Sequence, residues 1–175
     1  SCGDSASICQ IGLACVDAHN AIRTWSAYIN PLMPFAPFNT ELHGISAETV
    51  RSAPTFAQIW PDLLSLLIQQ PLVQHSRFDE RAINAACKTH ELTSPRLVWH
   101  DSVSIARNAW PELKSNGGHG LASLKRHLNL DFQHHDAGED ARAAAMVVIQ
   151  AEGVAPRTAV NDALRAKPFQ LSWLF

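Results

Sequence analysis

The spacing of apolar and polar residues predicts a β-hairpin at the start of the chain. Residues 7–17 are rich in apolar and small side chains, and residues 21–29 alternate between apolar and polar ones. Both patterns are typical of strands, and His19 and Asn20 between them suit a tight connection. The stretch that follows, 30–39, contains three prolines and predicts a surface loop.

Helical spacing dominates the rest of the chain. Thr55 is a candidate N-cap of a helix over 56–69, which Pro71 ends. Ser46 is a candidate cap of a short helix before it. The remaining helices are expected over 76–90, 102–110, 120–128, 137–150 and 160–166.

Two short strands are expected among these helices, one beginning at Leu72 and one over 96–100. The apolar face of the 76–90 helix is predicted to contain Phe78, Ala82, Ile83 and Ala86. A hairpin followed by alternating short strands and helices indicates an α/β domain with a mixed sheet. The strands are few for a sheet that must carry so many helices, so we expect one to be missing at the front.

Composition indicates one ordinary globular domain, 1–175, and narrows its partners. The chain is 46% hydrophobic and 17% charged, which excludes a disordered protein. Its apolar stretches are too short to cross a bilayer, and no basic segment leads into an apolar one. We therefore expect a cytoplasmic protein without a membrane partner. The formal net charge of −2 gives no basic excess for generic nucleic-acid binding, so phosphates would need a few arginines or bound cations.

The four cysteines do not have the C-x-x-C spacing of a zinc site. Cys9 and Cys15 lie in an apolar run and are interpreted as small buried residues. We expect reduced thiols at all four positions, including Cys2 and Cys87.

Residues 134–150 place a histidine and an aspartate at the start of one helix. Asp136 and Glu139 have the spacing of a capping box, which predicts that the helix starts at Ala137. The alanines that follow would let this helix lie close to a sheet. Asp140 then lies in the first turn, directly after the segment that carries His135. Metal-assisted hydrolysis uses a base of near-neutral pKa beside a carboxylate that holds a cation. The alternative is that the acidic residues only stabilise the helix end.

A second aspartate follows a predicted strand. Residues 71–86 run from a short buried strand into a helix, with Ser76 as the predicted N-cap and Asp79 in the first turn. Ligands of open α/β sheets bind at the carboxyl ends of strands. Asp79, Asp140 and His135 therefore form part of a candidate site for a hard cation such as magnesium or manganese. Helix capping is again the alternative interpretation of Asp79.

Several short motifs occur in an order that resembles one family. H-S-R-F-D at 75–79 and H-D-A-G-E-D-A at 135–141 resemble the second and third motifs of the DEDDh-type 3′→5′ exonucleases. This family is typified by the proofreading epsilon subunit of bacterial DNA polymerase III and by RNase T. Further matching segments are S-I-C-Q-I-G at 7–12, H-G-I at 43–45, A-P-T-F at 53–56 and the stretch at 99–111, so that the resemblance covers about 7–150.

The resemblance implies a ribonuclease H-like fold, a mixed five-stranded sheet flanked by helices. It also implies two divalent cations, Mg²⁺ or Mn²⁺, held by four acidic residues, with a histidine as general base. Asp79 and Asp140 match metal ligands, and His135 matches the general base. His43 matches a position close to the terminal nucleotide, and Ser76 stands where the commonest form of the motif has asparagine. Both are predicted to bind substrate.

The family's first motif, Asp-x-Glu on the leading strand, is not found within 1–175. Asp4, in a loop rich in glycine and serine, and Asp17, at the far end of its strand, are not convincing replacements. A sheet cut through its middle leaves unpaired backbone groups, each costing on the order of a kcal/mol, so we expect about ten further residues before Ser1.

The leading hypothesis is a metal-dependent 3′→5′ exonuclease that acts on single-stranded DNA or RNA 3′ ends, with a polymerase or another replication or repair protein as a candidate partner. One alternative is a non-catalytic member of the family that binds nucleotide or protein, because the first motif is absent here. Another is a phosphatase that uses the same aspartates. Candidate phosphate contacts are Arg77, Arg81 and Arg107; candidate interface residues, with the core as the alternative, are Trp99, Trp110 and Trp173.

Overall fold

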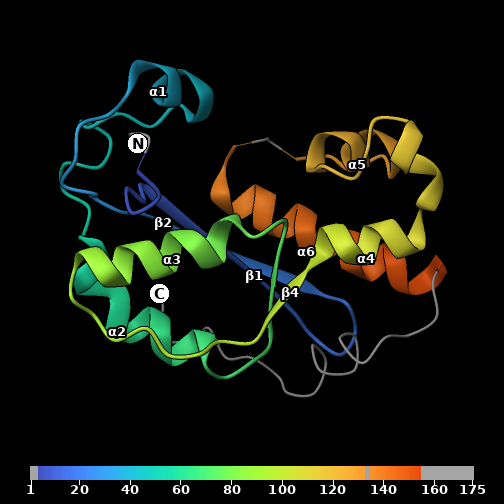
Figure 1. Ribbon diagram of the computed structural model, residues 1–175, viewed down its shortest axis with the longest axis horizontal. Helices are drawn as coiled ribbons and strands as arrows, with labels where there is room; N and C mark the ends of the chain where they lie inside the picture. The colour runs from blue at the N-terminus through green and yellow to red at the C-terminus, as the bar shows by residue number, and fades with distance from the viewer. Residues whose placement is uncertain (1–3, 133–134, 155–175) are drawn as a thin grey trace.

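The computed structural model describes residues 4–132 and 135–154, which form an α/β fold (Figure 1). The strands are β1 (Gln10–Val16), β2 (Ile22–Tyr28), β3 (Leu72–Gln74) and β4 (Trp99–Asp101). The helices are α1 (Pro37–His43), α2 (Phe56–Leu67), α3 (Phe78–Thr89), α4 (Ser102–Ala109), α5 (Leu121–His127) and α6 (Ala137–Val154), with a 3-10 helix, η1 (Pro111–Ser115), before α5. The predicted hairpin and the alternation of strands and helices after it are confirmed.

The N-terminal hairpin is shaped by Asp17. β1 and β2 pair antiparallel along their whole length. The Asp17 carboxylate accepts hydrogen bonds from the backbone N–H groups of His19 and Ala21, at 2.8 and 3.0 Å, and Asn20 between them has a φ of 64°. The connection is therefore the tight turn that the sequence predicts, and Asp17 serves that turn.

The four strands of the described residues form two separate pairs. β1 pairs antiparallel with β2, and β3 pairs parallel with β4. All seven residues of β1 are half-buried, although the apolar run after Gln10 is typical of a strand covered on both faces. β2 is more exposed, as is usual for an outer strand. Within 4–132 and 135–154, the mixed sheet is thus present as two halves, and not as one continuous sheet.

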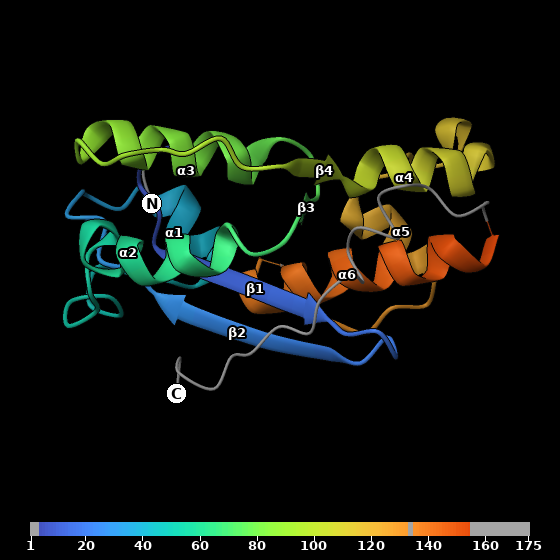
Figure 2. The ribbon, with the colours of Figure 1, turned by 90° about the horizontal axis from the view of Figure 1, so that it is seen from below.

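Helix α6 contacts both strand pairs. It packs on β1 and β2 and also touches β3, α4 and α5 (Figure 2). The sequence predicts close packing of this helix from its alanines, and this is confirmed. The buried positions of α6 are Gly138, Ala143, Ala144, Val147, Val148 and Ala151.

β1 and α6 come into backbone contact at Gly12. A Cβ atom at this position would lie 2.0 Å from the backbone oxygen of Ala137 and 2.5 Å from the backbone nitrogen of Gly138. On the helix side, a Cβ at Gly138 would lie 3.2 Å from the Cβ of Ser26 on β2. Position 12 therefore requires glycine because the first turn of α6 rests on the strand backbone.

Gln10 fixes the same end of α6. Its Nε2 donates to Oδ2 of Asp136 at 2.9 Å, and its Oε1 accepts from the N–H of Ala137 at 3.2 Å. Oδ1 of Asp136 accepts from the N–H of Glu139 at 3.0 Å, which confirms the predicted cap and the helix start. Partial burial opposes ionisation of Asp136, but the hydrogen bonds from Gln10 and from backbone N–H groups outweigh it and lower the pKa below 3.8.

Two main apolar clusters hold the helices in place. One joins α4, η1, α5 and α6 and contains Trp110, which is 6% exposed. The other joins Ile29 to α2 and α3. Trp110 is thus a core residue and Trp99 is half-buried, whereas Trp173 lies outside the described residues.

The cysteines of the described chain are free thiols, as predicted. Cys9 and Cys87 are buried, and Cys15 is half-buried. Burial raises the pKa of Cys15 to about 11, so its thiol is neutral at ordinary pH. Cys2 lies outside the described residues.

The segment before α2 differs from the prediction. The expected loop 30–39 gives way to α1 at Pro37, because a proline at the first helical position has its φ preset for a helix. Gly44, with a φ of 73°, ends that helix. The short helix expected after Ser46 is a turn, in which the hydroxyls of Ser46 and Thr49 each accept from the other residue's N–H.

The later boundaries agree more closely. Thr55 and Gln58 form the capping box of α2, although that helix ends at Leu67 instead of 69. β4 lies at 99–101 instead of 96–100. The expected helix over 160–166 lies outside the described residues. Among the described helices, none combines the length and the apolar character needed to span a membrane.

A Gly12→Ala substitution is expected to lower the free energy of unfolding by about 2 kcal/mol or more, because its Cβ collides with the backbone of α6. Gly153→Ala, where the space around the Cβ is open, is the matched control and should instead stabilise the helix by up to about 1 kcal/mol. Urea denaturation of both variants measures the difference. Equal effects would contradict the close approach.

An Asp136→Ala substitution is expected to cost about 1–2 kcal/mol at neutral pH through loss of the cap and of the Gln10 contact. The pKa of Asp136 is lower in the folded protein, so its contribution is present above the unfolded value near 3.8 and is lost as the pH falls through the lower folded value. The difference from wild type should therefore shrink in strong acid. Asp62→Ala, at an exposed position on α2, should have little effect at any pH.

Candidate functional site

β3 leads into α3 through a hydrogen-bonded loop that places Asp79. Ser76 has a φ of 74°, and its N–H donates to Oδ1 of Asp101 at 3.0 Å. α3 begins at Phe78, so Asp79 lies in its first turn, as predicted. The predicted cap role of Ser76 is wrong: Arg77 holds the N-cap position, because the left-handed conformation of Ser76 turns the chain before the helix starts.

The exposure of Phe78 at the start of α3 also differs from the prediction. Ala82 and Ala86 are buried as expected, but Phe78 is 67% exposed, because it is the first residue of the helix and lies away from the core. Arg77 forms an ion pair with Glu80 at 3.2 Å within the same turn. The other candidate phosphate contacts, Arg81 and Arg107, are exposed.

Asp79 and Asp140 lie within electrostatic range of one another. The pKa of Asp79 is raised mainly because the surrounding protein removes water from its carboxyl; a backbone hydrogen bond partly offsets this, and Asp140 adds a smaller like-charge contribution. Asp79 is nevertheless exposed and Asp140 is half-buried, so the two carboxyl groups stand at the boundary with solvent. A divalent cation between them would replace repulsion by attraction.

His135 is tied to Asp140 through its backbone. Its N–H donates to Oδ2 of Asp140 at 3.2 Å. The residue has a φ of 70° and is exposed. The imidazole therefore belongs to a turn whose position is set by one of the two carboxylates.

His43, the last residue of α1, lies near the same place. Its Nδ1 accepts from the N–H of Ile45 at 3.0 Å, and its Nε2 lies 3.9 Å from Sγ of Cys9. Because Nδ1 accepts a backbone hydrogen bond, the neutral ring carries its proton on Nε2. Burial lowers the pKa of His43, and the charge of His135 lowers it further, so the two rings are within electrostatic range.

Pairwise interactions thus connect four of the five predicted site residues. Asp79 interacts with Asp140, Asp140 with the backbone of His135, and His135 with His43. Ser76 lies on the loop that precedes Asp79, and its N–H contact is made to Asp101 on β4. The structure therefore brings residues from α1, α3 and the start of α6 to one region.

The chemistry of these donors fits part of a magnesium or manganese site. Both metals prefer carboxylate oxygens, and Mg²⁺ is commonly held by one or two carboxylates together with water and substrate phosphates. Within 4–132 and 135–154, no cluster of three or more His, Cys, Asp or Glu side chains forms a complete metal site. Asp79 and Asp140 can supply two ligands, half of the four that the family resemblance implies.

Two glutamines that hold the carboxylate-bearing helices escaped the sequence analysis. Gln10 holds the start of α6, as described above. Gln74, on β3, accepts a hydrogen bond from the N–H of Glu80 in the first turn of α3, at 3.0 Å. Each is a polar residue within an apolar strand sequence, which is the signal that could have identified them.

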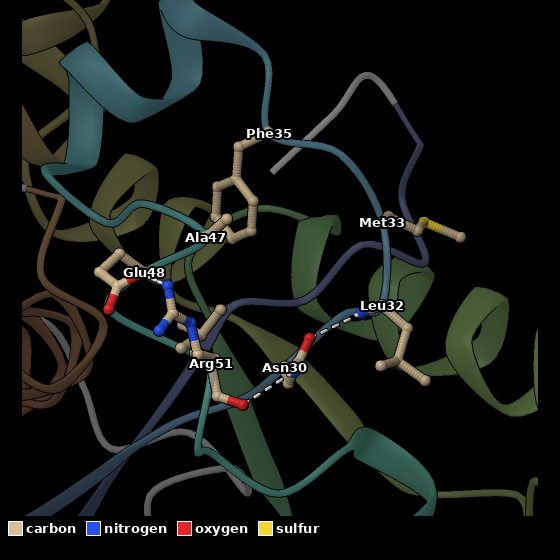
Figure 3. Close-up of a pocket in the computed structure, with 8 residues that line it drawn as sticks. Asn30, Leu32, Met33, Phe35, Ala47, Glu48 and Arg51 are labelled. Atoms are coloured by element: carbon tan, nitrogen blue, oxygen red, sulfur yellow. Dashed lines mark hydrogen bonds and ion pairs between the residues drawn. The ribbon is translucent and has the colours of Figure 1, made fainter.

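A pocket of about 350 Å³ lies in another region (Figure 3). Asn30 braces one wall: its Oδ1 accepts from the N–H of Leu32 at 3.0 Å, and its Nδ2 donates to the backbone oxygen of Arg51 at 3.4 Å. Arg51 also forms an ion pair with Glu48. The pocket is lined by Asn30, Leu32, Met33, Phe35, Ala47, Glu48, Val50 and Arg51, so it contains none of the five predicted site residues.

Known proteins with similar folds include several nucleases. The structure of Exonuclease X in complex with 5′ overhanging duplex DNA has a TM-score of 0.71 at 21% sequence identity, covering 94% of this chain and 95% of that one. The nuclease domain of 3′hExo, a DEDDh family member bound to rAMP, has a TM-score of 0.58 at 18% identity and covers 89% of this chain and 98% of that one. Together they show the ribonuclease H-like fold that the motifs imply.

Sequence relatives agree with this fold. DNA polymerase III PolC-type from Streptococcus pneumoniae is 32% identical over 149 residues, which is 83% of this chain. The corresponding protein of Caldanaerobacter subterraneus is 29% identical over 145 residues, or 82% of this chain. The chain spans about a tenth of the length of these relatives. Residues 2–148 match the family model described as Exonuclease. The chain therefore belongs to the exonuclease family.

Proposed function

We propose that this chain is the catalytic domain of a metal-dependent 3′→5′ exonuclease that hydrolyses the terminal phosphodiester bond of single-stranded DNA or RNA. The observation that carries the proposal is the like-charged pair Asp79 and Asp140, which lies beside the turn of His135. A partly desolvated carboxylate pair at the solvent boundary suits a cation that also binds substrate phosphate.

In this proposal Asp79 and Asp140 hold the metal ions from the first turns of α3 and α6. Two bound Mg²⁺ or Mn²⁺ ions would orient and polarise the attacking water and stabilise the leaving 3′ oxygen. His135 accepts the proton of that water in this proposal, because the residue is exposed and its backbone N–H is bonded to the Asp140 carboxylate. His43 and Ser76 contact the terminal nucleotide. Arg81 and Arg107, both exposed, are candidates for phosphate contacts farther along the strand.

We also propose that residues preceding Ser1 supply a further strand between β1 and β3. Support comes from the two unjoined strand pairs of the described residues and from β1, which is apolar after Gln10 yet only half-buried. α6 contacts both pairs, so it could cover one continuous sheet. Such a strand would carry the two acidic ligands that the family resemblance implies beyond Asp79 and Asp140.

The biological setting is part of the same proposal. A single-stranded end is the preferred substrate, because its unpaired bases can splay out and stack on side chains. The PolC-type relatives suggest a polymerase as partner, and Exonuclease X suggests DNA as one substrate. We place the protein in the cytoplasm, without a membrane partner.

Digestion of 3′-labelled DNA and RNA oligonucleotides by the full-length protein with Mn²⁺ tests the activity. Asp79→Asn and Asp140→Asn should each lower kcat by roughly 100-fold or more, because a metal ligand is lost. His135→Ala should lower it by roughly 100- to 10,000-fold through loss of the base. Asp62→Asn, at an exposed position on α2, is the control and should be fully active.

Several outcomes would count against this mechanism. Unchanged digestion by His135→Ala would remove the proposed base, and activity that survives a chelator would remove the metal. Oligonucleotide binding without cleavage would favour the non-catalytic family member. Hydrolysis of small phosphomonoesters but not of oligonucleotides would favour a phosphatase.

Amide hydrogen exchange tests the additional strand. The β1 amides that do not donate to β2 should exchange at least about tenfold more slowly in the full-length protein than in residues 1–175 alone, because a new neighbour would accept their hydrogen bonds. The amides of the β1–β2 ladder provide the internal control. A stably folded native protein with the 19.2 kDa mass of residues 1–175 would contradict the proposed strand.

A further inference from the structure

Gln74 makes an unusual contact for the last residue of a strand. The residue is only 4% exposed, so its amide group is enclosed by protein. Its Oε1 accepts a hydrogen bond from the backbone N–H of Glu80 at 3.0 Å. That N–H belongs to the peptide group that joins Asp79 to Glu80. The side chain of Gln74 therefore holds the backbone of Asp79 directly.

This contact replaces a conventional helix cap. The N-cap residue of α3, Arg77, makes no side-chain capping hydrogen bond. The first N–H groups of a helix require acceptors from outside the helix, and the side chain of Gln74 supplies one. The first turn of α3 is thus anchored to β3 across the loop that contains Ser76.

Gln74 is itself held by α4. Its backbone oxygen accepts from the hydroxyl of Ser102, which is fully buried, at 3.1 Å. Since that hydroxyl donates its proton to Gln74, it accepts from Nδ1 of His75, 2.9 Å away. These hydrogen bonds restrict the movement of the end of β3. The side chain of Gln74 can therefore hold the Glu80 N–H in a defined place.

We propose that Gln74 is a positioning residue that sets the place of the Asp79 carboxylate for a divalent cation. This rests on the proposed function, in which Asp79 is a metal ligand. Residues that orient a metal ligand without touching the metal commonly contribute about 10- to 100-fold to metal affinity. Gln74 acts from the strand and leaves the Asp79 side chain open to solvent.

The test compares two glutamines that each bind a backbone N–H at a helix start. Gln74→Met keeps the length and volume of the side chain but removes the acceptor. Gln58→Met does the same in the capping box of α2, a helix that carries none of the predicted site residues. In the full-length protein, titration with Mn²⁺ alone should show about tenfold weaker binding for Gln74→Met. Gln58→Met should bind Mn²⁺ like wild type, even where both variants lose stability.

A second measurement reports the contact without metal. Exchange of the Glu80 amide should be faster in Gln74→Met than in wild type, and unchanged in Gln58→Met. Gln74→Asn, one methylene shorter, serves the same purpose if the methionine variant does not fold.

Equal Mn²⁺ affinity in wild type and the Gln74 variants would overturn the proposal, as would an equal loss in the Gln58 variant. If wild type does not bind Mn²⁺, the proposed function fails and this inference fails with it. The two failures are distinguishable, because only the first leaves a wild-type protein that binds the metal.

Discussion

The contact between the backbone of β1 and the first turn of α6 is the constraint on which the rest of the site depends. It requires the absence of a side chain at Gly12, where a Cβ would lie 2.0 Å from a helix carbonyl oxygen. Gln10 then fixes the direction of the helix by donating to Asp136 and accepting from the N–H of Ala137, while Asp136 accepts from the N–H of Glu139. Asp140 lies in the same first turn, so its position follows from this steric fit and from the two hydrogen bonds that Gln10 makes.

The other carboxylate reaches the same region by an independent route. β3 ends at Gln74, the loop turns at Ser76, and Asp79 enters the first turn of α3. The exposed Asp79 still loses hydration at its carboxyl and faces the like charge of Asp140, and both effects raise its pKa. The stability of the fold thus comes from the clusters around α6 and α2, while the carboxylate region retains unfavourable electrostatics that a cation would relieve.

The sequence predicted elements best where local chemistry determines them. The capping box of Thr55 and the cap of Asp136 fixed two helix starts, and the hairpin turn followed from His19 and Asn20. The sequence-based prediction was wrong where a residue type has two common structural roles. Proline begins α1 but was interpreted as part of a loop, and Ser76 suits an N-cap but adopts a left-handed turn.

The convergence of the site residues was predicted from motifs and not from periodicity. Spacing alone left Asp79 and Asp140 with helix capping as an equal or better explanation. Their proximity depends on how α3 and α6 pack, which is decided by contacts between distant segments such as Gly12 with Ala137. The roles of Gln10 and Gln74 also depend on how distant segments pack. The sequence shows a polar residue in each strand, but it does not show which helix residue that side chain binds.

The half-covered state of β1 has a consequence for handling the isolated domain. Its sequence, Gln10–Val16, contains neither proline nor a charged residue, and in the described part of the chain it is hydrogen-bonded on one side only. Strand edges of this kind are templates for pairing with another molecule, and natural proteins usually protect them with charge, proline or a covering element. In the described part of the chain this edge lacks such protection and would favour pairing with another molecule until a further strand or a partner covers it.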